Sequence, residues 1–371
     1  MKTLIVYHYV ALYREPIFKE LVNKSDCHVA CDYKSNNDIE TVAINSEFYK
    51  KNFSKLDNKW LFKSLLWQRN LLNLILSRKY DKVIFLGDPH FISTWFAIFL
   101  NKIIGIKSYL WTHGFLNRSG KFLESIKIFM YGMCDGLLLY SHGAKNDLIK
   151  AGIESAKIHV IYNSLDYERH KIYREALSSN DITKCKKNLF KNPNLLQLMF
   201  IGRITKQKKL DMLVKALVSL HGSGQKVNLL IIGDGSQKAS LEKLVSDNSL
   251  NDYVCFYGKS YGEKELAPLI MSSDVCVSPG EIGLTAMHSL GYGTPVITHN
   301  DRNKQMPEFE AVISNETGVL FNEGSLESLV ESITNYQQLD LIALRANSIA
   351  IIEKNYTPQA QFKLIEKAIG V

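Results

Sequence analysis

The 371-residue sequence has few of the residues that interrupt or cross-link a fold. It contains 8 prolines, and its six cysteines form neither a CxxC pair nor a pattern with zinc-finger spacing. The low proline content, together with 46% hydrophobic residues, argues against a disordered chain. The cysteine spacing argues against a metal finger and is typical of a reducing compartment. We therefore expect a globular, cytoplasmic protein whose cysteines are small core residues.

The sequence also lacks a long uninterrupted hydrophobic run. The longest candidate runs from Phe91 to Leu100 and is followed by the polar pair Asn101 and Lys102. A membrane-spanning helix needs about 20 consecutive apolar residues, so we expect a packed helix here. The apolar residues Leu4–Tyr7 are too short for the core of a secretion signal and predict a buried first strand.

A complete dinucleotide-binding fingerprint is missing as well. The turn Gly233-Asp234-Gly235-Ser236 has no third glycine at the required spacing. A dehydrogenase is therefore disfavoured.

What is present is a regular alternation of strand-like and helix-like segments. This alternation is typical of parallel α/β domains, and a chain of this length exceeds the size that one core usually supports. We therefore predict two Rossmann-like parallel-sheet domains facing a central cleft. The strands are expected at Thr3–Tyr7, Lys82–Leu86, Ser108–Trp111, Gly136–Tyr140 and His159–Tyr162, and then at Leu196–Ile201, Asn228–Ile232, Val254–Phe256, Val275–Ser278 and Val296–Thr298.

The domain boundaries follow from a polar segment between the two series of strands. Residues 171–195 are charged and contain turn-forming residues, which indicates a hinge. We therefore place an N-terminal domain at 1–170 and a C-terminal domain at 196–355. The last helix, about 356–371, is expected to pack back on the N-terminal domain.

Two glycine-containing loops in the second half combine the groups that bind a pyrophosphate. After a predicted strand, Gly202 is followed by Arg203 and Lys208, which can contact phosphate oxygens as a fork and as a mobile point charge. Further on, Gly283 lets the backbone approach a phosphate, and the helix beginning near Leu284 adds its positive end. A solvated basic helix start is the alternative. Because the two loops could face each other, we favour a site for a departing nucleoside diphosphate.

These motifs resemble the family 4 retaining glycosyltransferases of the GT-B fold, the glycosyl transferases group 1. The family pattern runs Gly-Arg and then Lys-Gly; Gly202, Arg203 and Lys208 match it, and Lys209 stands where the family usually has glycine. The order of further motifs over roughly residues 80 to 325 is also similar. These motifs are Cys134-Asp135-Gly136, Ile161-Tyr162-Asn163-Ser164, Ile231-Ile232-Gly233-Asp234-Gly235, Val254-Cys255-Phe256-Tyr257-Gly258, Ser273-Asp274-Val275 and Gly293-Thr294-Pro295.

The resemblance assigns roles to individual residues. Arg203 and Lys208 would hold the leaving diphosphate, and Glu281 would approach the transferred sugar. The family's second glutamate, which binds the ribose, falls on His288; a neutral imidazole could take over that hydrogen bond, or His288 could be a core histidine. His113, at a strand end of the first domain, would approach the donor sugar, or it is a structural histidine in a turn. The donor-binding set is then Gly202, Gly258, Lys259, Gly283, Leu284, Thr285 and His288.

The resemblance implies a retaining, metal-independent hexosyltransferase that needs no cofactor. The expected donor is a UDP-sugar carrying a hexose or N-acetylhexosamine, and the acceptor a glycan or lipid-linked intermediate of bacterial surface polysaccharide, such as O-antigen, capsule or lipopolysaccharide. One alternative is a GDP-sugar (mannosyl or fucosyl) transferase of the same fold. A more distant one is an epimerase or phosphorylase, and a third is a noncatalytic scaffold or lectin-like subunit, which the missing second glutamate would suit. The first loop, His8–Pro16, departs from the family, so acceptor identity does not carry over.

The positive charge is concentrated in the first half. Residues 1–190 hold 28 Lys and Arg against 18 Asp and Glu, whereas residues 191–371 hold 17 against 19. The stretch Lys50–Lys82 combines basic residues with tryptophans, which suits either an anionic membrane surface or an ordinary helix with a solvated face. Nucleic-acid binding is disfavoured, because the donor-site residues account better for the chain. We expect a cytoplasmic enzyme, peripheral on the inner face of the membrane.

Overall fold

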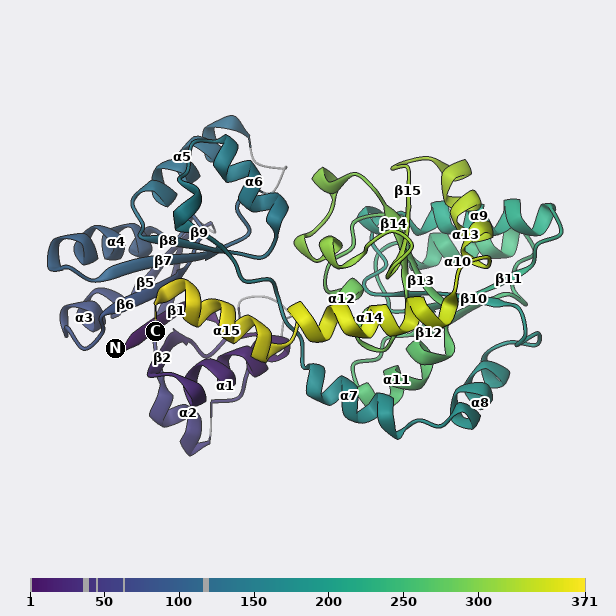
Figure 1. The fold of residues 1–371 in the computed structure, drawn as a ribbon, viewed down its shortest axis with the longest axis horizontal. Helices are drawn as coiled ribbons and strands as arrows, with labels where there is room; N and C mark the ends of the chain where they lie inside the picture. The colour runs from purple at the N-terminus through teal and green to yellow at the C-terminus, as the bar shows by residue number, and fades with distance from the viewer. Residues whose placement is uncertain (1, 36–39, 45, 63, 116–119, 371) are drawn as a thin grey trace. The chain divides into compact units, whose positions relative to one another are not determined.

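The computed structural model describes residues 2–35, 40–44, 46–62, 64–115 and 120–370 (Figure 1). The chain divides into two compact units, each with its own sheet. The first unit comprises Met1–Asp166 and Thr357–Val371, and the second comprises Tyr167–Tyr356. Within the described residues, every helix is too short or too polar to span a bilayer.

The first unit is built on a parallel sheet, as the alternation predicts, but the sheet has seven strands, and two of them, Cys27–Asp32 and Phe53–Lys55, were not predicted. Its strand order is β3-β2-β1-β6-β7-β8-β9, and all pairings are parallel. The strands read as continuous apolar runs because helices cover both of their faces. Their bounds are β1 Thr3–Tyr9, β2 Cys27–Asp32, β3 Phe53–Lys55, β6 Lys82–Leu86, β7 Lys107–Thr112, β8 Gly136–Leu139 and β9 Ile158–Val160.

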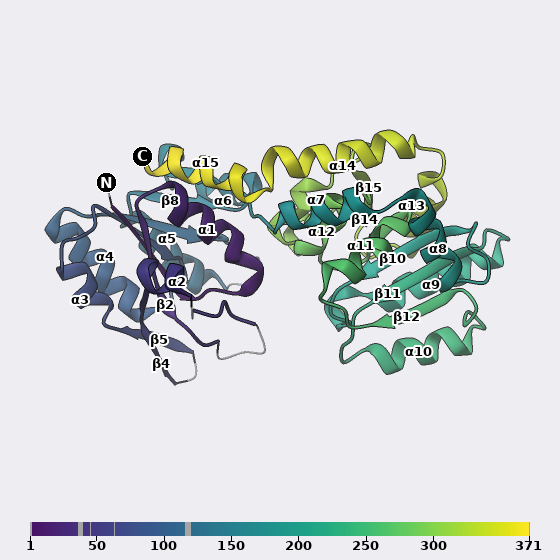
Figure 2. The ribbon, with the colours of Figure 1, turned by 90° about the horizontal axis from the view of Figure 1, so that it is seen from below.

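Different helices cover the two faces of this sheet (Figures 1 and 2). The apolar cluster on one face includes side chains of α1 (Glu15–Lys24), α2 (Glu47–Asn52) and α15 (Pro358–Ile369). The cluster on the other includes side chains of α3 (Leu71–Leu76), α4 (Ile92–Ile104), α5 (Lys121–Gly132) and α6 (His142–Lys150). The last helix, α15, is fixed to the first unit: Lys82 Nζ donates to the carbonyl of Gly370 at 2.9 Å, and Ser164 Oγ donates to Gln361 Oε1 at 2.7 Å.

The basic stretch Lys50–Lys82 does not form the continuous amphipathic face that its composition suggests. It contains the end of α2, then β3, then an antiparallel hairpin of β4 (Asp57–Leu61) and β5 (Leu65–Arg69), and then α3. The hairpin pairs Trp60 with Leu66, and Asn70, with φ 69°, separates β5 from α3. Strand pairing outweighs helix formation here, so the charges are distributed over several elements.

The second unit has a six-stranded parallel sheet of order β12-β11-β10-β13-β14-β15. Every strand predicted between residues 196 and 298 is present, and β15 was not predicted. The strands are β10 Leu196–Ile201, β11 Val227–Ile232, β12 Val254–Gly258, β13 Val275–Ser278, β14 Val296–His299 and β15 Gly318–Phe321. The helices are α9 Leu210–Gly222, α10 Lys238–Asp247, α11 Glu263–Ser272, α12 Leu284–Gly291, α13 Leu326–Tyr336 and α14 Leu341–Asn355.

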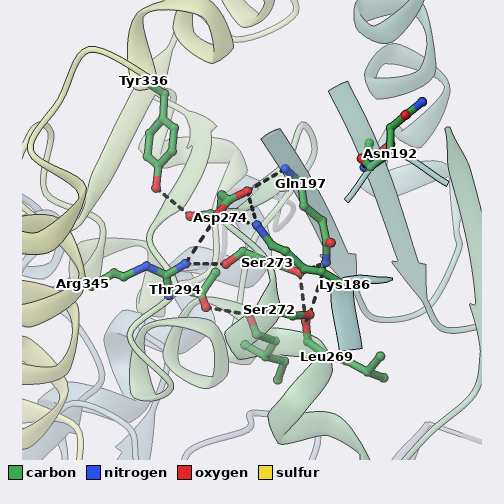
Figure 3. Close-up of polar contacts among 12 residues, drawn as sticks. Lys186, Asn192, Gln197, Leu269, Ser272, Ser273, Asp274, Thr294, Tyr336 and Arg345 are labelled. Atoms are coloured by element: carbon green, nitrogen blue, oxygen red, sulfur yellow. Dashed lines mark hydrogen bonds and ion pairs between the residues drawn. The ribbon is translucent and has the colours of Figure 1, made fainter. Parts of the chain in front are cut away.

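The polar segment for which a hinge was predicted, 171–195, is largely helical. It contains most of α7 (Tyr167–Ala176) and all of α8 (Ser179–Leu189), which begins with a capping box between Ser178 and Asp181. Lys186 on α8 forms an ion pair with Asp274 at 2.9 Å, and the Asp274 carboxylate also accepts from the backbone N–H of Gln197 at 2.8 Å (Figure 3). These contacts attach α8 to the second unit. A polar composition here reflects a surface helix and not an irregular linker.

Candidate functional site

Two loops meet at the carboxyl edge of the second unit's sheet. One follows β10 and leads to the short helix η3 (Lys206–Lys208); the other follows β13 and leads to α12. The backbone N–H of Gly280 donates to the carbonyl of Lys208 at 3.1 Å. A Cβ on Gly280 would lie 1.9 Å from the carbonyl oxygen of Gln207, so only glycine permits this approach. The structure therefore brings together the two motifs that the sequence predicts to face each other.

This junction joins the lysine and the glutamate of the predicted site. Lys208 Nζ donates to the backbone carbonyl of Glu281 at 2.8 Å and lies 3.9 Å from its Oε1. Both side chains are about one-fifth exposed, so they are partly withdrawn from water yet open to a ligand. A cation and a carboxylate held side by side can bind the departing phosphate and the sugar of one donor molecule.

Glycines bring the ends of three neighbouring strands together around Arg203. Gly202 has φ +144° and donates its N–H to the carbonyl of Ile232 at 2.9 Å; a Cβ on Gly233 would lie 1.9 Å from the Gly202 carbonyl oxygen. Gly233 in turn donates to the carbonyl of Gly258 at 2.8 Å. Arg203 is exposed beside this edge. The predicted donor residue Lys259 directly follows Gly258 and is also exposed.

The start of α12 is fixed from two sides. Thr285 Oγ1 donates to the carbonyl of Ile201 at 3.0 Å, which ties the first turn of the helix to the end of β10. Leu284 is the first residue of this helix. At Gly283 an added Cβ would lie 3.7 Å from Glu308 Oε2, so a carboxylate stands beside the helix start. The N-terminal end of α12 is therefore positioned by β10, the strand that precedes Arg203.

Glu308 is a residue that the sequence analysis missed. It is buried, at 3% exposed, and lies in the segment η5 (Pro307–Ala311), which follows β14. Gln305 Oε1 accepts from the backbone N–H of Ile282 at 2.7 Å and so binds this segment to the loop of Glu281. The sequence did contain a signal for Glu308: it is an acidic residue that follows a proline in the segment after β14, the strand beside β13 in the sheet. Carboxyl ends of parallel strands share one edge, which would have placed it near the site.

His288 lies one turn into α12 and is already engaged with a carboxylate. Its Nε2 is 3.2 Å from Glu263 Oε2 on α11, and His170 Nε2 on α7 is 3.3 Å from Glu263 Oε1. Tyr292 also donates to Glu263, at 2.6 Å. Burial alone would raise the pKa of Glu263, but the hydrogen bonds from His170 and His288 outweigh it and hold the pKa well below its usual range. This network supports a structural role for His288; the predicted ribose contact stays a prediction.

The same network includes the one group among the described residues whose geometry could hold a metal ion. The ligand atoms of His170, Glu263 and His288 lie within 4.8 Å of one another. Two imidazoles and a carboxylate are a donor set that suits a transition metal. The distances above also satisfy ordinary hydrogen bonds, and those already account for all three side chains.

The first unit carries its own cluster of predicted and missed residues. His113 follows β7, and its ring lies 4.5 Å from that of Tyr140. Arg14, which the sequence analysis missed, is buried above the Trp111 ring at 4.8 Å and donates to the Tyr140 hydroxyl at 2.9 Å. Burial, Arg14 and Lys127 lower the pKa of His113 to about 4, so this imidazole is neutral at physiological pH. His113 is therefore suited to hydrogen bonding and not to charge stabilisation.

Comparisons with known proteins find a similar family and similar folds. A sequence model of the family described as Glycosyl transferases group 1 matches residues 181–351. The chain is 27% identical over 332 residues to an uncharacterised 41.2 kDa protein in the cps region of Klebsiella pneumoniae, covering 85% of this chain and 83% of the relative.

Solved structures show the fold. HepE of Anabaena, in complex with UDP, has a TM-score of 0.75 at 16% identity, with full coverage of both chains. The lipopolysaccharide outer core galactosyltransferase WaaB has a TM-score of 0.73 at 17% identity, covering 100% of this chain and 99% of that one. Residues 181–351 therefore belong to the glycosyl transferases group 1, and the chain has the fold of the GT-B glycosyltransferases. The comparisons support glycosyltransferase activity.

Proposed function

We propose that the protein is a retaining glycosyltransferase that moves a hexose or N-acetylhexosamine from a UDP-sugar to a glycan or lipid-linked acceptor of a bacterial surface polysaccharide. The observation that carries this proposal is the contact of Lys208 Nζ with the backbone of Glu281 at 2.8 Å. It joins a leaving-group cation to a sugar-facing carboxylate at the edge where α/β sheets bind ligands. The exposed Arg203 and the start of α12 lie at the same sheet edge and would add positive charge for the diphosphate.

The proposed reaction is a front-face substitution. The bond between the anomeric carbon and the diphosphate oxygen breaks, and the acceptor hydroxyl oxygen forms its bond to the same face of that carbon. The hydroxyl proton passes to the departing phosphate oxygen, so the enzyme needs no nucleophile of its own. Arg203 and Lys208 would stabilise the charge that develops on the diphosphate, and Glu281 would orient the sugar and balance positive charge on its ring.

The relatives support the choice of donor and pathway. HepE is known in complex with UDP-glucose as well as UDP, WaaB by its name acts on lipopolysaccharide outer core, and the Klebsiella relative is encoded in a cps region. We infer from these names a UDP-sugar donor and an acceptor destined for the cell surface. Such precursors are made from cytoplasmic nucleotide sugars, so we propose a cytoplasmic enzyme that works at the inner face of the membrane.

Donor choice is tested by hydrolysis and binding with a panel of nucleotide sugars. A ligand at a hundred times its dissociation constant stabilises a protein by about 2.7 kcal/mol, which a thermal shift detects. We expect UDP-sugars to stabilise the protein and to be hydrolysed slowly without acceptor. Stabilisation by GDP-sugars alone would overturn the UDP assignment. Failure of every nucleotide sugar to bind would favour a noncatalytic subunit.

Stereochemistry and metal dependence need separate measurements. We expect proton NMR of the product to show the anomeric configuration of the donor, and an inverted product would refute the retaining mechanism. We also propose that catalysis requires no metal. Activity should therefore survive dialysis against a chelator, in the wild type and in a His170→Asn variant that breaks the three-residue group described above. Loss of activity on chelation, restored by a divalent ion, would refute this.

A further inference from the structure

The first unit exposes apolar side chains along one side of α4. Phe96, Phe99 and Ile103 follow one another at helical spacing and are 54%, 60% and 67% exposed. The opposite side of the same helix is buried, with Ala97 and Ile98 in the core. The packed helix predicted for Phe91–Leu100 is thus packed on one side only. Packing within the first unit explains why the buried side of α4 is apolar. It does not explain why the exposed side is apolar as well.

The exposed face continues onto α5. Phe122 and Phe129 lie seven residues apart, which places them on one side of the helix two turns apart, and they are 81% and 66% exposed. The ring of Trp95 on α4 stacks on Phe129 with the ring centroids 6.1 Å apart. The two helices therefore share one apolar surface, which we call the α4–α5 face: Trp95, Phe96, Phe99, Ile103, Phe122 and Phe129.

The hairpin of the basic stretch adjoins this face. Trp67 on β5 meets Phe96 with ring centroids 5.7 Å apart, and the tip of the hairpin exposes Leu61 and Phe62. Monomeric proteins rarely expose apolar surface on this scale unless it binds something. Among the described residues, every exposed phenylalanine and tryptophan belongs to the first unit.

The charge of the first unit indicates what the α4–α5 face binds. The first unit holds 24 Lys and Arg against 16 Asp and Glu, a formal charge of +8, whereas the second holds 21 of each. Helix α4 contains no acidic residue, and the exposed Lys102 and Lys121 lie beside Ile103 and Phe122 in the sequence. Two copies of so basic a unit would repel each other, which disfavours self-association through this face. Aromatic side chains bordered by lysines are what an anionic membrane surface binds.

We propose that the α4–α5 face docks the protein on an anionic lipid bilayer, with the aromatic side chains entering the headgroup region and Lys102 and Lys121 meeting lipid phosphates. Docking rests on the exposed side chains of the first unit. Only the further idea, that it brings the enzyme to a lipid-linked acceptor, rests on the proposed function. The membrane-binding surface predicted at Lys50–Lys82 is therefore assigned to α4 and α5 instead, and the hairpin of that stretch adjoins it.

The test is cosedimentation of the full chain with phosphatidylcholine vesicles, with and without phosphatidylglycerol. We expect binding to the anionic vesicles only. The triple variant Phe96→Gln/Phe99→Gln/Phe122→Gln should lower the partition coefficient about tenfold or more, because each substitution removes a large exposed apolar side chain that would enter the bilayer. The matched control is Ile342→Gln in the second unit, where the isoleucine is 83% exposed and the expected change is less than about twofold.

Two further measurements separate the possible outcomes. Lys102→Gln/Lys121→Gln should weaken binding to anionic vesicles and make it less sensitive to salt, because fewer charges contribute. Donor hydrolysis should be the same in the triple variant as in the wild type. If the wild type itself hydrolyses no donor, that result counts against the proposed function and not against docking. Equal vesicle binding by the wild type and the triple variant would overturn the proposal. The proposal would also be overturned if the wild type bound neutral and anionic vesicles equally. The same holds if the wild type formed a concentration-dependent dimer that is lost in the triple variant alone.

Discussion

The two units share a parallel-sheet architecture but differ in how they use their surfaces. The first unit carries the whole net charge of +8 and, among the described residues, every exposed phenylalanine and tryptophan, while the second is formally neutral and exposes fewer large apolar side chains. In the second unit, glycine contacts at the sheet edge bring the loops around Lys208 together, where we propose a small-molecule site. We infer that one fold has been specialised twice, for a large apolar surface in one unit and for a polyanionic ligand in the other.

The two key arginines show the same contrast. Arg14 in the first unit is buried against Trp111 and Tyr140, whereas Arg203 in the second is exposed at a strand end. A buried guanidinium over aromatic rings fixes the local structure. Burial lowers the pKa of His113, and this guanidinium lowers it further. An exposed guanidinium beside close-packed glycines remains available to phosphate. The same residue type thus has an architectural role in one unit and a predicted ligand-binding role in the other.

The largest expected effect concerns the phosphate-binding role of the second unit. Arg203→Ala or Lys208→Ala should lower turnover about 10²–10³-fold, because each removes a preorganised charge from the leaving group. Steady-state kinetics with the best donor measures this. Lys215→Ala, which removes an exposed lysine of α9, is the matched control and should stay near wild-type activity. Near-normal turnover in both site variants would remove the basis for contrasting the two units.

A second prediction separates the stability of the two units. Glu263→Gln should lower the unfolding free energy of the second unit by about 2–3 kcal/mol at pH 7, since a partly buried carboxylate holds two histidines and a tyrosine. Its pKa is depressed, so the stabilisation is present above the ordinary value of about 4.3 and is lost as the pH falls below it. The difference in unfolding free energy between the wild type and the variant should therefore become smaller at acidic pH.

The measurement uses the distribution of tryptophan. All four, Trp60, Trp67, Trp95 and Trp111, belong to the first unit, so tryptophan fluorescence follows that unit and circular dichroism follows both. Glu263→Gln should shift only the circular dichroism transition in urea. Glu265→Gln, at an exposed site on the same helix, should have a much smaller effect. A shift of the fluorescence transition by Glu263→Gln would mean that the units unfold together.

The third prediction decides between two roles of His288. If it contacts the ribose, His288→Ala should raise the donor's apparent binding constant about tenfold with a smaller effect on turnover, because uniform binding is lost. His170→Asn breaks the same network from α7 and is the control. An equal effect of both variants on donor binding would mean that His288 acts only by holding Glu263. Unchanged donor affinity in a folded variant would leave it a structural histidine.

The smallest expected effect is a pH dependence confined to the first unit. Burial is the main cause that lowers the pKa of both His8 and His113 to about 4. The unfolded chain binds protons near pH 6.5 and the folded one does not, so stability falls as the pH drops from about 6.5 towards 4. We expect each histidine to contribute a loss of roughly 1 kcal/mol between about pH 6.5 and 5.5. His8→Gln/His113→Gln should flatten this slope in the fluorescence-detected transition, and an unchanged slope would contradict it.

Much of the fold and part of the site follow from the sequence alone. The apolar runs predict both parallel sheets because strands buried on both faces must be continuously hydrophobic. The motifs around Gly202 and Gly283 predict a phosphate site because glycines let the backbone approach a phosphate and a helix start offers its N–H groups to it. What periodicity did not predict were β2 and β3 at one edge of the first sheet, the β4–β5 hairpin, and β15, a short strand at the edge of the second sheet.

Only the tertiary structure decided which side chains meet and which stay exposed. The Glu263 network joins residues from three helices that are far apart in the sequence, and Glu308 reaches the start of α12 from the segment after a different strand. The apolar residues of α4 and α5 look like core in the sequence, because periodicity shows that a helix has apolar faces but not what covers them. That depends on the neighbouring elements, and around α4 and α5 part of the apolar surface is left to solvent.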